Sequence, residues 1–209
     1  NGNTGTDEAV VRAFDGFVDV YVDLQFSTYF VPSKLTAQDG MEVSLQNFEK
    51  VTIDGNVAAT ILGTAAANTL IGDSGADTIT GRAGADALTG GSRSDIFVFS
   101  SGDTGITEAT ADTITDFSTG TDKIDIATLG SYVEADGTAT ADLAAFITAA
   151  DASLPTTSID IYAQYNFKGE GNTLVVIDED KSGAVNTGDT LIILTGLSTA
   201  GGLDASDFI

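Results

Sequence analysis

Short runs of apolar residues, separated by turn-forming residues, predict that this chain consists mainly of β-strands. Between residues 17 and 26 apolar side chains alternate with polar ones, the period of two expected for a half-buried strand. Other short apolar runs lie at residues 43–53, 159–167, 174–177 and 191–194. Residues 141–152 differ, because their apolar side chains recur at the spacing of one helical face. These side chains are Leu143, Phe146, Ile147 and Ala150. The pattern therefore predicts β-structure with one short amphipathic helix.

The strongest pattern is a repeat of nine residues over residues 63–98. The units read GTAAANTLI, GDSGADTIT, GRAGADALT and GGSRSDIFV. Glycine opens each unit, a carboxylate or amide stands sixth, and a large apolar residue stands eighth. The sixth positions are Asn68, Asp77, Asp86 and Asp95, and the eighth positions are Leu70, Ile79, Leu88 and Phe97. A weaker unit that starts at Asp54 places Ile61 in the eighth position, so the pattern extends toward the N-terminus.

Such a repeat suits a coil of short strands better than a helix or a long strand. We expect two units to make one turn of a flattened, right-handed parallel β-roll. The eighth side chains would point inward as a thin apolar core, and the opening glycines would allow backbone dihedral angles that a Cβ resists. The expected fold class is therefore all-β: a short right-handed parallel β-roll followed by a β-rich C-terminal cap with one short helix.

The sixth-position residues indicate metal binding. Units two apart lie on the same edge of such a roll, so Asn68 should face Asp86, and Asp77 should face Asp95. Stacked carboxylates repel one another, and Ca²⁺ would relieve the repulsion because it prefers carboxylate and carbonyl oxygens. The carbonyls would come from the turns opened by Gly72, Gly81 and Gly90. The alternative, a glycine-rich loop with incidental aspartates, accounts poorly for four units in register.

A second candidate calcium site lies at residues 178–189, which read DEDKSGAVNTGD. Oxygen-bearing residues at positions 1, 3, 5, 9 and 12, with glycine at position 6, match the spacing of an EF-hand loop. The expected ligands are Asp178, Asp180, Ser182, Asn186 and Asp189 through their side chains, and Ala184 through its carbonyl. The flanking runs TLVVI and TLIIL read as strands, so we expect a β-hairpin that carries the loop. A polar hairpin turn without an ion is the alternative.

Composition narrows the functional classes. The chain has 31 acidic and 8 basic residues and a formal charge of -23. We therefore expect neither nucleic acid nor an anionic membrane as a partner, because both require basic patches. No apolar run approaches the ~18 residues of a membrane span, so membrane insertion is not expected. Histidine and cysteine are absent, which removes the commonest catalytic and zinc-binding devices. Several bound Ca²⁺ would offset the charge; an acidic, soluble surface is the alternative.

The repeats resemble the GGxGxDxUx repeats of RTX proteins, the calcium-binding exported proteins of Gram-negative bacteria. The chain departs from that pattern where Thr64, Asp73 and Arg82 replace the second glycine, Ala66 and Arg93 replace the fourth, and Asn68 replaces the aspartate. Residues 96–105 and 111–126 resemble the segment that follows the repeats in serralysin-type proteases. That resemblance implies that Asp103 and Asp112 hold another Ca²⁺ where the roll meets its cap; a solvated loop is the alternative.

The last residues, GGLDASDFI, resemble the C-terminal export signal read by type I secretion machinery, and an ordinary final strand is the alternative. The sequence thus predicts three segments. Residues 1–44 form a β segment that caps or precedes the roll, residues 45–100 form the RTX β-roll, and residues 101–209 form the cap with the calcium loop and the export signal.

The leading hypothesis is a non-catalytic, calcium-binding structural and secretion module that folds on Ca²⁺ outside the cell. It would belong to a surface or S-layer-like protein or an adhesin of a Gram-negative bacterium, with self-association in a surface layer as a further expectation. The alternative is the accessory C-terminal domain of a secreted protease, lipase or alginate epimerase whose catalytic domain lies upstream. A third hypothesis, catalysis by two paired carboxylates, finds no motif that singles out such a pair.

Overall fold

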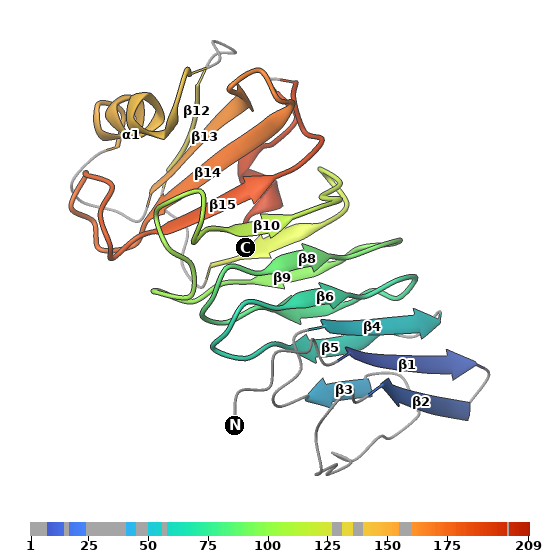
Figure 1. Cartoon of the computed structure of the whole chain (residues 1–209). Helices are drawn as coiled ribbons and strands as arrows, with labels where there is room; N and C mark the ends of the chain where they lie inside the picture. The colour runs from blue at the N-terminus through green and yellow to red at the C-terminus, as the bar shows by residue number, and fades with distance from the viewer. Residues whose placement is uncertain are drawn as a thin grey trace, which may run out of the picture.

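The computed structural model describes residues 8–14, 17–23, 41–44, 50–55, 58–126, 131–135, 140–154, 160–199 and 201–209. Its strands are β1 (Glu8–Phe14), β2 (Phe17–Asp23), β3 (Met41–Ser44), β4 (Lys50–Gly55), β5 (Ala59–Leu62), β6 (Thr69–Ile71), β7 (Thr78–Thr80), β8 (Ala87–Thr89), β9 (Ile96–Val98), β10 (Asp112–Ile114), β11 (Lys123–Asp125), β12 (Tyr132–Ala135), β13 (Asp160–Phe167), β14 (Asn172–Asp178) and β15 (Thr190–Leu194). A ten-stranded sheet has the order β12-β13-β14-β15-β10-β8-β6-β4-β1-β2, and a five-stranded sheet has the order β11-β9-β7-β5-β3. The two sheets stack as a β-roll that leads into a cap (Figure 1), which confirms the expected fold class.

Two nine-residue units make one turn of the roll. β6 pairs in parallel with β8, which sets Leu70 beside Leu88, and β7 pairs in parallel with β9, which sets Ile79 beside Phe97. Successive units therefore alternate between the two sheets, as the period predicts. The eighth-position side chains Ile61, Leu70, Ile79, Leu88 and Phe97 are all 0% exposed. The thin apolar core expected from the repeat is confirmed.

The two sheets continue beyond the last repeat recognised in the sequence. β10 pairs in parallel with β8, and β11 pairs in parallel with β9. Ile114 and Ile124, which lie in these two strands, are fully buried in the same core. The sequence ADTIT occurs at residues 76–80 and again at residues 111–115. The same local sequence therefore makes a roll strand in both places, on either side of an added loop that contains Asp103.

The opening glycines are needed because a Cβ would collide with neighbouring atoms. The sequence-based expectation, that they provide unusual backbone dihedral angles, is wrong. Gly81 and the other opening glycines are not among the residues with positive φ. A Cβ on Gly81 would lie only 2.3 Å from Oδ2 of Asp86 in the same unit. The left-handed backbone instead occurs at the second position, at Asp73 (φ 70°) and Arg82 (φ 68°). The glycines therefore make room for the carboxylates.

The cap has its own apolar core beneath α1 (Leu143–Asp151). The helix begins after Asp142, whose Oδ1 accepts a hydrogen bond from the Ala145 N–H at 2.9 Å. The Phe146 ring lies 5.6 Å from the Tyr162 ring and 6.4 Å from the Phe167 ring. The expected helix and the expected cap strands, β13, β14 and β15, are confirmed. Among the described residues, no helix has the length and apolarity needed to cross a membrane.

The cap is joined to both sheets of the roll. β15 pairs in parallel with β10, which makes the ten-stranded sheet continuous from roll to cap. After the short helix η1 (Ala205–Asp207), Phe208 forms a β-bridge with Ile124 of β11. The Ile209 N–H donates to the Ile124 carbonyl at 3.0 Å, and the buried Phe208 ring lies 5.7 Å from Tyr132. The last residues of the chain are therefore packed into the fold.

Replacing Leu88 with Ala tests the packing of the roll. Because Leu88 is 0% exposed, L88A is expected to lower the free energy of unfolding by about 2–5 kcal/mol. The measurement is urea denaturation at saturating Ca²⁺. Ser92→Ala, at an exposed turn residue, is the control and should stay within about 0.5 kcal/mol of the original protein. A loss for L88A no larger than for S92A would contradict a close-packed core.

Candidate metal centres

Buried carboxylates form a ladder along each edge of the roll. In each rung, Oδ1 of a carboxylate accepts a hydrogen bond from the backbone N–H of the equivalent residue one turn earlier. The rungs join Ala59 N to Asp77 (2.7 Å), Asn68 N to Asp86 (2.7 Å), Asp77 N to Asp95 (2.8 Å), Asp86 N to Asp112 (2.8 Å) and Asp95 N to Asp122 (3.0 Å). The structure thus brings together the residue pairs singled out in the sequence.

The rungs divide into two edges. The Asp86 edge consists of Asn68, Asp86 and Asp112, which lead into strands of the ten-stranded sheet. The Asp95 edge consists of Asp77, Asp95 and Asp122, which lead into strands of the five-stranded sheet. Within each edge, the carboxylates lie one above another at the spacing of one roll turn.

The second oxygen of most ladder carboxylates is buried and has no partner. The Oδ2 atoms of Asp77, Asp86, Asp95 and Asp112 accept no hydrogen bond, and these side chains are at most 2% exposed. A buried charged oxygen without a partner is costly, so unpaired groups of this kind need a physical reason. A cation beside the Oδ2 atoms would supply it. The carboxylates and turn carbonyls of the ladder therefore fit Ca²⁺, which takes oxygen ligands.

Burial raises the pKa of the ladder carboxylates far above the ordinary value of an aspartate. The pKa rises to about 8 for Asp112, about 7 for Asp77, and about 6 for Asp86 and Asp95. Removal from water is the largest cause, the backbone N–H bonds oppose it, and neighbouring carboxylates add to it. The ionised form of the ladder carboxylates is thus unfavourable unless a cation lies nearby.

Asn68 does not share the unpaired oxygen of the other ladder residues. Its Oδ1 accepts hydrogen bonds from Thr64 N at 2.6 Å and from Thr64 Oγ1 at 3.2 Å. The amide oxygen is therefore satisfied inside its own unit. The fit to a cation is poorer at Asn68 than at Asp77 or Asp95.

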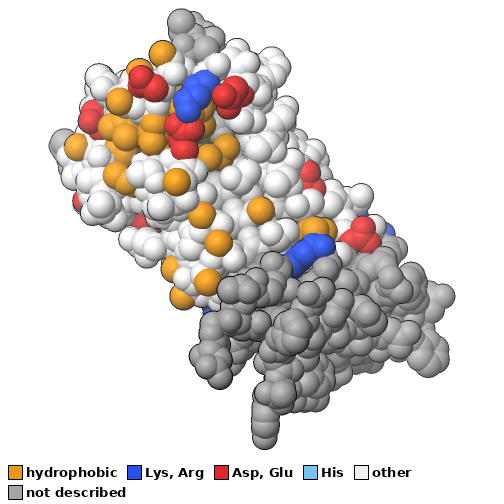
Figure 2. Space-filling model, viewed as in Figure 1, with side chains coloured by type: hydrophobic (Ala, Val, Ile, Leu, Met, Phe, Trp, Pro, Cys, Tyr) orange, Lys and Arg blue, Asp and Glu red, His pale blue; other side chains and the backbone are white. Residues whose placement is uncertain are grey.

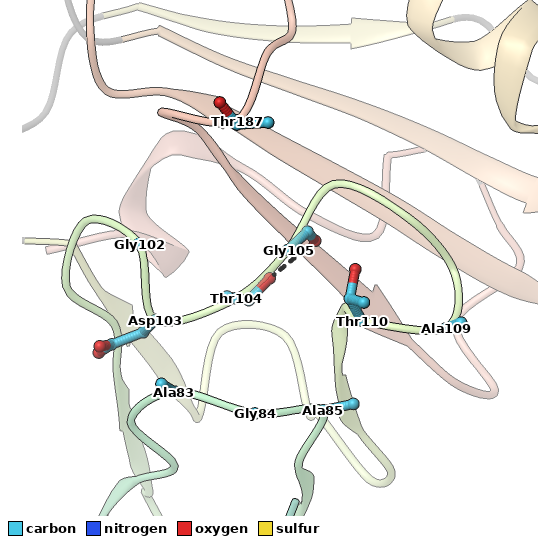
Figure 3. Close-up of a pocket in the computed structure, with 10 residues that line it drawn as sticks. All are labelled: Ala83, Gly84, Ala85, Gly102, Asp103, Thr104, Gly105, Ala109, Thr110 and Thr187. Atoms are coloured by element: carbon cyan, nitrogen blue, oxygen red, sulfur yellow. Dashed lines mark hydrogen bonds between the residues drawn. The ribbon is translucent and has the colours of Figure 1, made fainter. Parts of the chain in front are cut away.

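Asp103 lies in the added loop, beside a cavity where the roll meets the cap. The cavity, of about 480 Å³, lies between Ala83, Gly84 and Ala85 of a roll turn and the Gly102–Gly105 stretch of the loop, with Thr187 of the cap on its other side (Figure 3). Oδ2 of Asp103 accepts a hydrogen bond from Ser100 N at 2.9 Å. The charge of Asp103 helps to raise the pKa of both Asp86 and Asp112. Asp103 and Asp112 thus lie within electrostatic reach of each other.

The loop at residues 178–189 connects β14 to the antiparallel β15, so the expected hairpin is confirmed. Oxygen atoms of Asp178, Asp180 and Asp189 lie within 4.8 Å of one another. Asp178 Oδ2 accepts from Gly183 N at 2.8 Å, and Asp189 Oδ2 accepts from Asn186 N at 2.7 Å. The structure therefore brings the three carboxylates close together.

Further oxygens of this loop surround the Asn186 amide. Its Nδ2 lies 2.9 Å from Asp180 Oδ2, 3.0 Å from Ser182 Oγ and 2.9 Å from the Ala184 carbonyl oxygen. An amide group has two N–H donors, so three acceptors exceed what it can satisfy fully. All six residues expected from the EF-hand spacing thus lie around one oxygen-rich centre, a donor set that suits Ca²⁺.

Sequence reasoning missed two carboxylates at the far end of the Asp95 edge. Asp122 is 2% exposed and accepts from Asp95 N, as given above, and from Ser118 N at 2.8 Å. Asp116 accepts from Gly90 N at 3.0 Å and Gly91 N at 2.7 Å. A signal for Asp122 was present, because residues 117–125 place Asp122 sixth and an isoleucine eighth, as in the repeats.

Replacing Gly72 with Ala tests the coupling between glycine and carboxylate. A Cβ there would lie 2.4 Å from Asp77 Oδ2 and 2.7 Å from the Gly90 carbonyl oxygen. G72A is expected to lose about 1–3 kcal/mol of stability through overpacking and to bind Ca²⁺ more weakly. Urea denaturation and calorimetric titration measure both. Gly169→Ala is the control, because no atom lies within 4 Å of its Cβ position and only backbone strain at φ +74° is added. G169A should keep the calcium affinity of the original chain, and an equal loss of calcium affinity in the two variants would refute the coupling.

The raised pKa values predict an unusual pH response of the calcium-stripped protein. The folded state holds protons on Asp77, Asp86, Asp95 and Asp112 up to pH values of about 6 to 8, whereas the unfolded chain releases them near pH 4. Protonation therefore favours the folded state, and this contribution is lost as pH rises from 5 to 8. Circular dichroism should show more β-structure at pH 5 than at pH 8 without calcium. Calcium affinity should rise over the same range, because binding needs ionised carboxylates. A calcium-stripped chain that loses β-structure on acidification to pH 5 would be the opposite result.

Comparisons with known proteins give a family. The family model described as Peptidase M10 serralysin C terminal matches residues 23–209. No curated protein matches the chain significantly. Among solved structures, the solution structure of the AlgE6R3 subunit from the Azotobacter vinelandii mannuronan C5-epimerase is similar, with 20% identity, a TM-score of 0.27, and coverage of 74% of this chain and 78% of that chain. Because the family model covers most of the sequence, the chain belongs to the serralysin C-terminal family, whose members are non-catalytic modules with an RTX-type β-roll.

Proposed function

We propose that this module folds when it binds several Ca²⁺ ions outside the cell. The observation that supports this most directly is the set of buried Oδ2 atoms without a partner on Asp77, Asp86, Asp95 and Asp112. Ca²⁺ supplies the positive charge that the ladder lacks. Because the ladder carboxylates come from different turns, one ion bound between two of them ties the turns together, and metal binding becomes coupled to folding.

The same coupling supports a role in export. In the low Ca²⁺ of the cytosol, the repulsion among the carboxylates would keep the chain loose enough for passage through a channel. Outside the cell, higher Ca²⁺ would fold it, and the formal charge of -23 would be offset by bound ions. The final residues, 201–209, would serve as the signal read by type I secretion machinery of a Gram-negative bacterium. The module itself carries no catalytic role in this proposal.

The cap would hold its own ion in the loop at residues 178–189. Asp178, Asp180, Ser182, Asn186 and Asp189 would bind it through side chains, and Ala184 through its carbonyl. Burial raises the pKa of Asp178, and it raises the pKa of Asp189 to about 6. A nearby cation would therefore stabilise the ionised form of both carboxyl groups. Asp103 and Asp112 would contribute to a further ion between roll and cap. Calcium would then stabilise both parts of the module.

Two hosts fit such a module. The first is a surface or S-layer-like protein or adhesin, to which the module would supply export and self-association. The second is a secreted enzyme with an upstream catalytic domain, and the family description, which names a peptidase, favours this host. Sequencing the parent gene separates them. An upstream HExxH or Gly-x-Ser-x-Gly element would indicate an enzyme, and long Thr- and Ala-rich β-repeats would indicate a surface layer.

Asp95→Asn tests calcium-coupled folding. The amide oxygen can still accept the bond from Asp77 N, but the negative charge is lost. In chelator, the original chain should lack most of its β-structure by circular dichroism and regain it cooperatively as Ca²⁺ is added, with several ions bound by calorimetry. D95N should need roughly 10-fold more Ca²⁺.

Glu170→Gln is the matched control, because it removes one exposed charge in the turn between β13 and β14. E170Q should fold at the same Ca²⁺ concentration as the original chain. Mg²⁺ in place of Ca²⁺ should induce little folding, since Mg²⁺ demands a stricter octahedral shell. A chain that is fully folded in chelator and indifferent to Ca²⁺ would overturn the proposal.

A further inference from the structure

One contact sets the first turn of the Asp86 edge apart from the rest of the ladder. The Arg82 Nη1 donates a hydrogen bond to the Gly63 carbonyl oxygen at 3.1 Å, one roll turn away. Arg82 adopts a φ of 68°, in the left-handed region that favours glycine. A strained backbone is thus retained at a residue whose side chain reaches across to the neighbouring turn.

The oxygens of this turn are already engaged. The Gly63 carbonyl accepts from Arg82, and Oδ1 of Asn68 accepts from Thr64 N and Thr64 Oγ1. Asn68 is also neutral, unlike the residue at every other rung of the roll from Asp77 onward. Between Asn68 and Asp86 there is therefore only one carboxylate, and the guanidinium occupies a turn carbonyl oxygen that could otherwise bind an ion.

The equivalent turn of the Asp95 edge has the opposite composition. Asp77 and Asp95 are both carboxyl groups with a buried Oδ2 that has no partner. The second-position residue that corresponds to Arg82 is Gly91, which carries no charge, and Asp73, which corresponds to Thr64, adds to the repulsion on Asp77. This pair of turns holds three carboxylates and the cation Arg93, which makes no described contact with a turn carbonyl, whereas the other pair holds one carboxylate and the cation Arg82. Of these two pairs of turns, only the one with Asp77 and Asp95 has two buried Oδ2 atoms without a partner for a cation to satisfy.

We propose that the Arg82 guanidinium takes the place of a calcium ion between the turn at residues 63–68 and the turn at residues 81–86. This step of the roll closes without metal, and the unpaired Oδ2 of Asp86 serves an ion shared with Asp112 instead. The Asp95 edge, from Asp77 to Asp122, has no such substitute and binds Ca²⁺ at each step. The ion count in this inference rests on the calcium binding proposed above, whereas the Arg82 contact does not.

The double variant Asn68→Asp, Arg82→Gly tests the substitution. It restores the carboxylate, frees the Gly63 carbonyl and provides glycine at the left-handed position. Calorimetric titration with Ca²⁺ should find one more ion bound to N68D/R82G than to the original chain. Arg93→Gly is the matched control, because Arg93 also has a positive φ (90°) and an exposed side chain, as Arg82 does, but makes no described contact with a turn carbonyl. R93G should leave the ion count unchanged. An equal ion count in N68D/R82G and the original chain would overturn the inference.

A second measurement does not depend on counting ions. Arg82→Ala keeps the backbone strain and removes only the cross-turn contact. At saturating Ca²⁺, its urea midpoint should fall by roughly 0.5 M, while Arg93→Ala should leave the midpoint unchanged. Equal midpoints for the two variants would refute the role of Arg82. If no variant binds Ca²⁺, the proposed function fails, but the midpoints still decide whether Arg82 ties the two turns together.

Discussion

The constraint on which this fold depends is the burial of like-charged oxygens along the edges of a thin roll. Asp77, Asp86 and Asp95 each use one oxygen to hold the backbone N–H of the preceding turn, and this bond leaves the second oxygen buried beside the opening glycine of the unit. The glycine must lack a Cβ because the carboxylate occupies that space. The strands are short because each edge turn leaves only about three residues of its unit for the sheet. Backbone register, glycine placement and charge are thus consequences of one arrangement.

The repeat made much of this predictable. A period of nine with an apolar eighth residue led to the pairing of Leu70 with Leu88 and to the burial of that whole row. The strands β10 and β11 were not predicted from the sequence, because the added loop around Asp103 breaks the period. Asp122 and Ile124 nevertheless keep the spacing of a repeat. Local sequence cannot reveal that a loop returns the chain to the same sheet.

Other features depend on contacts between turns, which a linear pattern does not contain. The opening glycines were expected to provide unusual dihedral angles, but the left-handed positions fall on Asp73 and Arg82, and Gly81 instead avoids a collision. The hydrogen bond from Arg82 to Gly63 joins residues one turn apart, and the spacing of the repeat does not predict it. The spacing of residues 178–189, by contrast, singled out Asp178, Asp180 and Asp189, which the structure brings close together because they lie within one hairpin loop.

The cap gives the roll a protected end. A roll of parallel strands would otherwise expose the unpaired backbone of its last strands, a risk for association with other chains. β15 covers β10, and Phe208 and Ile209 cover β11. Asp207 reinforces this closure, since it accepts from Gly120 N at 2.8 Å and lies 3.6 Å from the Lys123 ammonium. Figure 2 shows hydrophobic side chains gathered on part of the cap surface. In the same view, acidic side chains lie on both the cap and the roll. The tail proposed as an export signal is thus also a structural element of the folded module.

The central claim, that cations satisfy the buried carboxylate oxygens, is tested most directly by a crystal structure of the chain grown with Ca²⁺, with the ions located by their anomalous scattering. Ions are expected about 2.3–2.6 Å from Oδ2 of Asp77 and Asp95, with turn carbonyls completing the shell, and none is expected between Asn68 and Asp86. A well-ordered roll whose Oδ2 atoms contact only water or protein, with no ion at either edge, would contradict it.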